Sequence, residues 1–600
     1  MTTHLPPASC RAFALGLCAL ALANCGTAAP SAPTATPAAA PAASAVAPSA
    51  KPAAPSEPVF AAPASAKPAM VASLVASAPA KIVADLDALS RRLDLPMMLG
   101  KEVRSALGGM GLLGDEARFS AVWERLDPAT PFAAVWVLPP KSEVKGFCAA
   151  LTFRDGQGAR RTFEEMGTPG AQRSGLSERK TPGGDILWGG VRGRTLFLSG
   201  SPEALLLAGG LAEAAQATLP AGQIAVTVLP PAIVVASGKS REALVADLLA
   251  GMTKEITSTP GLATPASRRF VTALMAGAVK VVFDATEIRL LLDLGPDDGL
   301  LLQTEIFPAP GTSLAARAAA RAPYVFDTRL PVRDDGTAAL AFGSLSGSVS
   351  LLAKPFAASG PAGQGLARAM EKYFSATREW SCVVEPAEAG FASLCSSPLR
   401  PGVTPKAALD GAAALMEAQQ AWEGELYGKK LGPLKIKRSR DVIEIDKKFE
   451  QPDPQARAMA KAFAGGESLK TVCRVKNGRL LQATGRDAKK TLARYGAEGS
   501  LKGAPLVSAA LTRAKGSEGV LSVDVISMAL KMLGQGKDLP GNPLAMVAAA
   551  LPGVPELRAP FWFVVRGGNT LAGDFRIPLG SLEKVAKVVR GMLSTAGAKP

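Results

Sequence analysis

The feature that most restricts how this chain can fold is a long segment of alanine, proline, serine and threonine near its N-terminus. It runs from Gly26 to about Ala78, and ten prolines lie between Pro30 and Pro68. Such a segment buries too little apolar surface to fold, so we expect a disordered linker that behaves as an extended spacer. At ~3.1 Å per residue it would reach on the order of 150 Å. The folded part is therefore expected within residues 79–600.

The rest of the chain has enough apolar material for a sizeable core. Of all residues 48% are hydrophobic and 20% charged, whereas only 5% are aromatic, so the core should consist of Ala, Leu and Val. Strand-like runs joined by Gly- and Pro-rich turns alternate with amphipathic helices, a pattern typical of antiparallel sheets with helices packed on one face. We predict an α+β fold. Among its elements we expect a helix with Ser201 as N-cap and Pro202 at its first position, and a strand at residues 279–283.

A short apolar run, residues 12–23, precedes the linker. A spanning helix needs about 20 residues, so this run is typical of the h-region of a secretory signal. Two cleavage sites compete. Residues 21–23 form an A-x-A site for signal peptidase, and Leu22-Ala23-Asn24-Cys25 resembles the lipobox of bacterial lipoproteins.

The resemblance implies that residues 1–24 are a signal peptide and that Cys25 becomes the lipidated first residue. Residues 25–78 would then hold the folded part away from a membrane to which the acyl chains bind. The expected location is the outer membrane of a Gram-negative bacterium, facing the periplasm or the cell surface. The alternative is a secreted protein with a loose N-terminal tail.

Four cysteines remain after the signal and the lipidated residue are set aside. Cys382 and Cys395 lie in two short strand-like runs around a turn centred on residues 388 and 389, which would place them opposite each other. A disulfide there fits an oxidising compartment, and two buried thiols are the alternative. Cys148 and Cys473 are either buried thiols or a long-range pair.

An internal duplication is indicated by two similar segments, residues 191–200 and 475–485. Each is a predicted hairpin followed by a helix, a strand and another helix. We further matched the strand at 132–138 with the one at 338–342. This predicts two related modules, residues 79–322 and 323–600. The second would carry an insertion near residues 355–430 that holds the cysteine hairpin and a helix at 405–420.

The chemistry of the mature chain is restricted by its lack of histidine, because the single histidine, His4, lies in the signal. Residues 343–347 spell G-x-S-x-G, yet no histidine is left to take the serine proton, and we expect a hairpin there. The Gly-Lys-Ser sequence at 238–240 lacks the first glycine of a phosphate loop. No catalytic, cofactor or metal site is predicted.

A basic segment is the remaining candidate site. Its partners could be anionic lipid, acidic polysaccharide or an envelope protein, whereas nucleic acid is disfavoured by export. The alternative is an edge strand whose lysines prevent pairing with other chains. The residues concerned are Lys429, Lys430, Lys435, Lys437, Arg438 and Arg440.

Three functional classes follow. The first is a non-catalytic lipoprotein of the cell envelope with a binding or structural role, for which the groove between the modules is the expected surface. The second is a periplasmic carrier or chaperone for an apolar ligand, which needs an apolar cavity. The third is a histidine-free hydrolase that would use a Ser-Lys or carboxylate pair.

Overall fold

The fold is known from a computed structural model of the chain. It describes residues 60, 70–95, 98–102, 116–138, 146–181, 184–218, 222–258, 264–295, 299–319, 323–332, 338–343, 346–387, 390–448, 461, 464–496, 504–524, 560–567, 570–584 and 586–587. The predicted signal peptide, Cys25 and most of the linker lie outside these residues.

The strands of the first half are β1 (Met70–Ala76), β2 (Phe132–Val137), β3 (Gly146–Thr152), β4 (Thr168–Arg173), β5 (Leu176–Lys180), β6 (Ile186–Arg192), β7 (Thr195–Ser199), β8 (Ile224–Val228), β9 (Ala285–Gly295) and β10 (Gly299–Pro308). Those of the second half are β11 (Ala338–Phe342), β12 (Trp380–Pro386), β13 (Phe391–Pro398), β14 (Lys435–Arg438), β15 (Val442–Lys448), β16 (Ser468–Lys476), β17 (Arg479–Thr484), β18 (Gly519–Asp524), β19 (Pro560–Gly567) and β20 (Leu571–Ile577).

The helices between them are α3 (Pro79–Arg92), α5 (Glu116–Arg125), α6 (Gly156–Glu165), α7 (Pro202–Gln216), α8 (Pro230–Ser237), α9 (Arg241–Ser258), α10 (Pro265–Phe283), α11 (Ser313–Ala319), α12 (Ser346–Ser359), α13 (Pro361–Ala376), α14 (Pro405–Tyr427), α16 (Ala488–Ala493) and α17 (Pro505–Arg513). Helix α7 begins as its sequence predicts, with Pro202 in the first turn and the Ser201 hydroxyl accepting from the Ala204 N–H at 3.0 Å.

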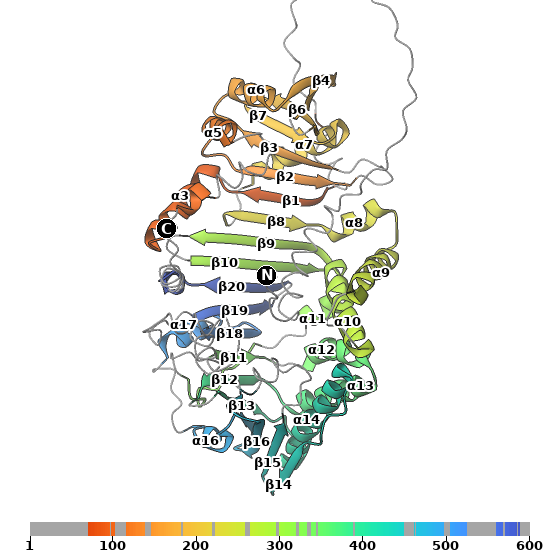
Figure 1. Cartoon of the computed structure of the whole chain (residues 1–600), viewed down its shortest axis with the longest axis vertical. Coiled ribbons are helices and arrows are strands. Elements are labelled where there is room, and N and C mark those ends of the chain that lie inside the picture. Colours follow the sequence, from red (N-terminus) through yellow and green to blue (C-terminus); the bar gives the residue numbers. More distant parts are fainter. Residues whose placement is uncertain are drawn as a thin grey trace, which may run out of the picture. The chain divides into compact units, whose positions relative to one another are not determined.

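The twenty strands that the structure describes join in one antiparallel sheet (Figure 1). Read from one edge to the other, the order is β4-β5-β6-β7-β3-β2-β1-β8-β9-β10-β20-β19-β18-β11-β12-β13-β17-β16-β15-β14. The predicted α+β fold with antiparallel pairing is therefore confirmed.

This strand order shows the duplication directly. From the centre outward, the first half has the order β10-β9-β8-β1-β2-β3-β7-β6-β5-β4, and the second half has the order β20-β19-β18-β11-β12-β13-β17-β16-β15-β14. Each strand of the first half therefore has a counterpart whose number is ten higher. We call β1–β10 with their helices the first module, and β11–β20 with theirs the second module. The modules meet where β10 pairs with β20, with Gln303 opposite Asp574. When the strand pairings are traced outward from this junction, Gln303 and Asp574 occupy equivalent positions in their modules. The pairing of β10 with β20 therefore has an approximate two-fold symmetry.

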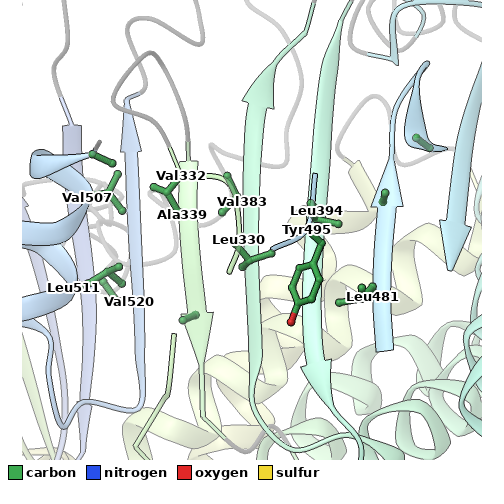
Figure 2. Packing of buried hydrophobic residues seen from close by; sticks show 14 of the residues in the cluster. Leu330, Val332, Ala339, Val383, Leu394, Leu481, Tyr495, Val507, Leu511 and Val520 are labelled. Atoms are coloured by element: carbon green, nitrogen blue, oxygen red, sulfur yellow. The ribbon is translucent and has the colours of Figure 1, made fainter. Parts of the chain in front are cut away.

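Helices fill corresponding places in the two modules. Helix α7 packs on Val135, Cys148 and Phe197 of the first module. In the second module α16 and α17 pack on the equivalent face, where Val507 and Leu511 lie beside Val520, and Tyr495 lies beside Leu394 (Figure 2). The other face is covered near the outer strands by α6 in the first module and by α14 in the second.

The structure corrects three parts of the predicted module map. The match between the two hairpins is confirmed, since β6–β7 corresponds to β16–β17. The strand at 338–342 corresponds to β1, however, and not to the strand at 132–138. The cysteine hairpin β12–β13 is the counterpart of β2–β3, and α14 is the counterpart of α6, so residues 355–430 are no insertion. The sequence match failed because these segments share topology without sharing residues.

Two boundaries also differ from the prediction. Residues 70–76 were assigned to the linker, yet they form β1, which pairs on both sides with β2 and β8. The predicted strand at 279–283 is the last part of α10. Its apolar, β-branched sequence is compatible with either structure when read alone.

Candidate binding surface

The predicted basic segment lies at one edge of the sheet. Lys435, Lys437 and Arg438 belong to β14, which pairs with β15 alone among the described strands, and Lys429, Lys430 and Arg440 lie exposed in the flanking turns. Lys437 stands opposite Glu444 and Lys435 opposite Asp446 on β15. Arg438 Nη1 lies 2.6 Å from Asp410 Oδ1.

This arrangement matches the edge-strand alternative. Exposed lysines on a short outer strand hinder pairing with another chain, and acidic residues on the neighbouring strand and helix balance part of their charge.

The predicted disulfide is confirmed. Cys382 and Cys395 face each other on β12 and β13 with their Cα atoms 4.0 Å apart and are joined. Cys148 and Cys473 are separate buried thiols. Burial raises the pKa of both, that of Cys473 to about 12, so neither is a nucleophile near neutral pH.

The G-x-S-x-G sequence does not form the expected hairpin. Gly343 follows β11 and α12 begins at Ser346, so the motif joins a strand to a helix. Ser344 lies outside the described residues. Within the parts of the chain that the structure describes, no group of three or more potential metal ligands occurs, and no helix is both long and apolar enough to cross a membrane.

The most densely connected polar cluster surrounds Asp327, which sequence reasoning did not identify. Its Oδ2 atom accepts hydrogen bonds from Ser396 at 2.6 Å and from the Tyr495 hydroxyl at 2.7 Å, and it lies 3.0 Å from Arg479 Nε. Arg329 Nε donates to Oδ1 at 2.9 Å. Burial raises the pKa of Asp327, but these donors and cations outweigh it and lower the pKa to about 2.

This cluster fastens segments together. Asp327 precedes β11, Ser396 lies on β13, Arg479 starts β17 and Tyr495 follows α16, so one carboxylate joins four parts of the second module. Every oxygen of the carboxylate already has partners, which leaves it unsuited to act as a base.

A second feature is an apolar surface on the central strands. Side chains that stand opposite each other in an antiparallel pair point to the same face. The pairings Trp136–Phe147, Leu74–Val226, Leu292–Leu302 and Leu302–Phe575, together with the two-residue alternation along each strand, therefore place one set of apolar side chains on one face. We call this set the apolar strip: Leu74, Trp136, Phe147, Val226, Leu290, Leu292, Leu302 and Phe575.

The apolar strip is open to a degree unusual for large apolar side chains. Trp136, Phe147 and Leu302 are 39%, 38% and 41% exposed, and the other members are half-buried. At one end of β9, Leu89 of α3 and Leu93, which follows this helix, pack near Leu294, which lies on the same face. The helices α8 and α10 also contact β9. The strip is thus bordered by helices while its middle stays accessible.

On β9 and β10 the face opposite the apolar strip carries charged and polar side chains beside Leu291. Arg289 pairs with Glu287 at 2.5 Å, and its guanidinium lies over the Phe307 ring. Gln303 Nε2 donates to Glu305 at 3.3 Å. On β9 and β10 the leucines of the apolar strip are therefore not the ordinary outer surface of a one-sided sheet. On β2 and β3 the face opposite the strip packs against α7.

At the junction between the modules, where a groove was expected, the sheet continues from β10 into β20. The apolar strip crosses this junction and takes its place as the candidate surface. No protein-family model, curated protein or solved structure matches the chain.

Proposed function

We propose that this chain is an exported, lipid-tethered protein that binds an apolar ligand on the apolar strip without chemically changing it. The observation that carries the proposal is the exposure of the large apolar side chains Trp136, Phe147 and Leu302 along one face of the central strands. Contiguous exposed apolar surface marks sites for protein, lipid or ligand. The proposal unites the binding role with the carrier role predicted from the sequence.

The polar clusters favour binding over turnover. The Asp327 carboxylate is fully occupied, and the buried thiols of Cys148 and Cys473 are held protonated. Lys447 is buried but lies 2.6 Å from Glu423, so its ammonium is paired rather than free to act as a base. A purely structural role would not explain why large apolar side chains of the apolar strip are exposed.

The test uses two leucines that are neighbours in sequence and lie on opposite faces of β9. Leu292→Ser places a hydroxyl in the apolar strip, whereas Leu291→Ser makes the same change on the charged face and is the matched control. Burial of one leucine is worth about 1.5–3 kcal/mol. We therefore expect Leu292→Ser to weaken binding of a fluorescent long-chain fatty acid roughly tenfold or more.

Equal affinities for the two variants would contradict the proposed surface. Absence of fatty-acid binding by the unmodified protein would contradict the proposed ligand class. Circular dichroism of both variants checks that the sheet is retained, since both replace a half-buried leucine on the same strand.

The tether is tested separately. Cys25→Ala removes the residue that would be lipidated, and we expect the protein to move from the membrane fraction to the soluble fraction. A Cys18→Ala variant is the control, because it changes a cysteine within the signal. Continued membrane association of the Cys25→Ala protein would refute lipid anchoring at this residue.

A further inference from the structure

One residue of the predicted linker, Phe60, packs against the folded part of the chain. Its ring meets the ring of Phe197 on β7 edge-on, with 4.5 Å between the centroids. It also contacts the buried cluster beneath α7, to which Phe197, Leu205 and Ala208 belong. An aromatic residue in an extended Ala/Pro segment would contact this cluster only if the chain at that residue docks on the folded part.

The place that Phe60 occupies depends on a glycine. Gly209 lies within α7, and a Cβ added there would overlap the Phe60 ring. Glycine inside a helix costs about 1 kcal/mol relative to alanine, so its presence needs a packing reason. The ring of Phe60 supplies that reason.

A third contact covers the ring. The guanidinium of Arg192, at the end of β6, lies 5.8 Å from the Phe60 ring centre. Arg192 is in turn held by Glu213 of α7 at 3.2 Å. Phe60 is therefore enclosed by a strand, a helix and a cation, which we call the Phe60 seat: Arg192, Phe197 and Gly209.

We propose that the Phe60 seat is a docking site for the linker of this same chain, and that it sets the free length of the tether. The free part would then end at Phe60 rather than at Met70, where β1 begins. Counted from Cys25 this is about 35 residues instead of about 45, or roughly 110 Å instead of 140 Å of maximal reach.

The seat also fixes the side of the sheet on which Phe60 lies. Helix α7 covers the face that carries Val135 and Cys148, whereas Trp136 of the apolar strip alternates with Val135 and points the other way. Phe60 therefore lies on the face of the sheet opposite the apolar strip.

The experiment uses chymotrypsin on the full-length protein, because this protease must take the phenylalanine ring into its own pocket. Phe60 is the only aromatic residue between Cys25 and Phe119. We expect slow cleavage after Phe60 in the unmodified protein. Gly209→Ala should expel the ring without unfolding α7, since alanine favours helix, and accelerate this cleavage at least tenfold.

The matched control is Gly365→Ala, which makes the same change within α13 where nothing lies near the added carbon. It should cleave at the rate of the unmodified protein. Cleavage after Phe60 at one rate in all three proteins would overturn the proposal. Equal acceleration in both variants would overturn it as well, because the effect would then not depend on the seat. Neither result bears on fatty-acid binding at the apolar strip.

Discussion

The two modules share one strand order but are held together differently at the same position. Cys382 and Cys395 are bonded across β12 and β13. The equivalent residues of the first module, Ala134 and Ala149, stand opposite each other on β2 and β3 as a pair of small side chains. The comparison teaches that this topology does not require the crosslink, which is an addition made in the second module.

A second difference concerns an arginine near the turn of each hairpin: Arg194 lies in the turn just before β7, and Arg479 is the first residue of β17. In the first module Arg194 lies 2.8 Å from Asp127, whose carboxylate mainly accepts from the backbone of Ala129 close by. In the second module Arg479 reaches Asp327, which comes from a different part of the chain and gathers further partners. Similar arginines are thus neutralised by carboxylates of unrelated origin, one local and one central to its module.

The largest expected difference between the modules is in how much Asp327 and Asp127 contribute to the free energy of unfolding. Asp327→Ala leaves Arg479 and Tyr495 buried without their acceptor, and loss of one member of a buried ionic cluster costs about 3–5 kcal/mol. Asp127→Ala removes mainly local hydrogen bonds, for which we expect about 1 kcal/mol. Urea unfolding of both variants measures the difference, and equal losses would show that the Asp327 cluster is not central.

The disulfide can be removed from one module and introduced into the other. Replacing Cys382 and Cys395 together by alanine recreates the pair of the first module and should lower the free energy of unfolding by about 3 kcal/mol. Ala134→Cys combined with Ala149→Cys should form a new bond, detectable by a thiol assay under denaturing conditions. Free thiols in that double variant would mean that the two hairpins are less alike than their registers indicate.

Acid should weaken the second module through Asp327. Its pKa is about 2 in the folded chain and about 3.9 when unfolded. A lowered folded pKa contributes stability that is complete above about pH 4 and is lost as the pH falls toward 2. The contribution is on the order of 2 kcal/mol. The difference in the free energy of unfolding between the unmodified protein and the Asp327→Asn variant should therefore decrease as the pH falls from about 4 toward 2. A difference that stays constant would contradict the assignment of this acid sensitivity to Asp327.

The last prediction concerns a property that the two modules share, the low reactivity of a buried thiol. Cys148 and Cys473 are buried in different modules, and burial raises the pKa of each thiol. Both should react with iodoacetamide at pH 8 at least about a hundredfold more slowly in the native protein than in urea. Rapid labelling of one of them, located by mass spectrometry, would reveal local opening of its module.

Local patterns predicted the hairpins well. The cysteine hairpin was placed in its correct register because turn residues and strand length fix which residues stand opposite. The Ser201-Pro202 pair likewise predicted the start of α7. Short apolar runs such as 279–283 were misread because Val and Phe suit both a strand and the buried end of a helix.

The candidate surface could not be predicted, because exposure depends on what covers a strand. The sequence of β9, with leucine at 290, 291 and 292, has apolar residues on both faces and is typical of a strand buried on both sides. Nothing local indicates that one face stays open. The Asp327 cluster was missed for a related reason, since its members lie far apart in the chain and meet only after folding.

The pairing of β10 with β20 has a consequence for biogenesis. A ribosome makes β10 long before β20, which is the last strand that the structure describes in the chain. Until residues 571–577 emerge, β10 presents an unpaired edge rich in leucine and isoleucine, a template for association with other nascent chains. The first module therefore completes its edge only when the end of the second has been made, and we expect association between chains to be most frequent during that interval.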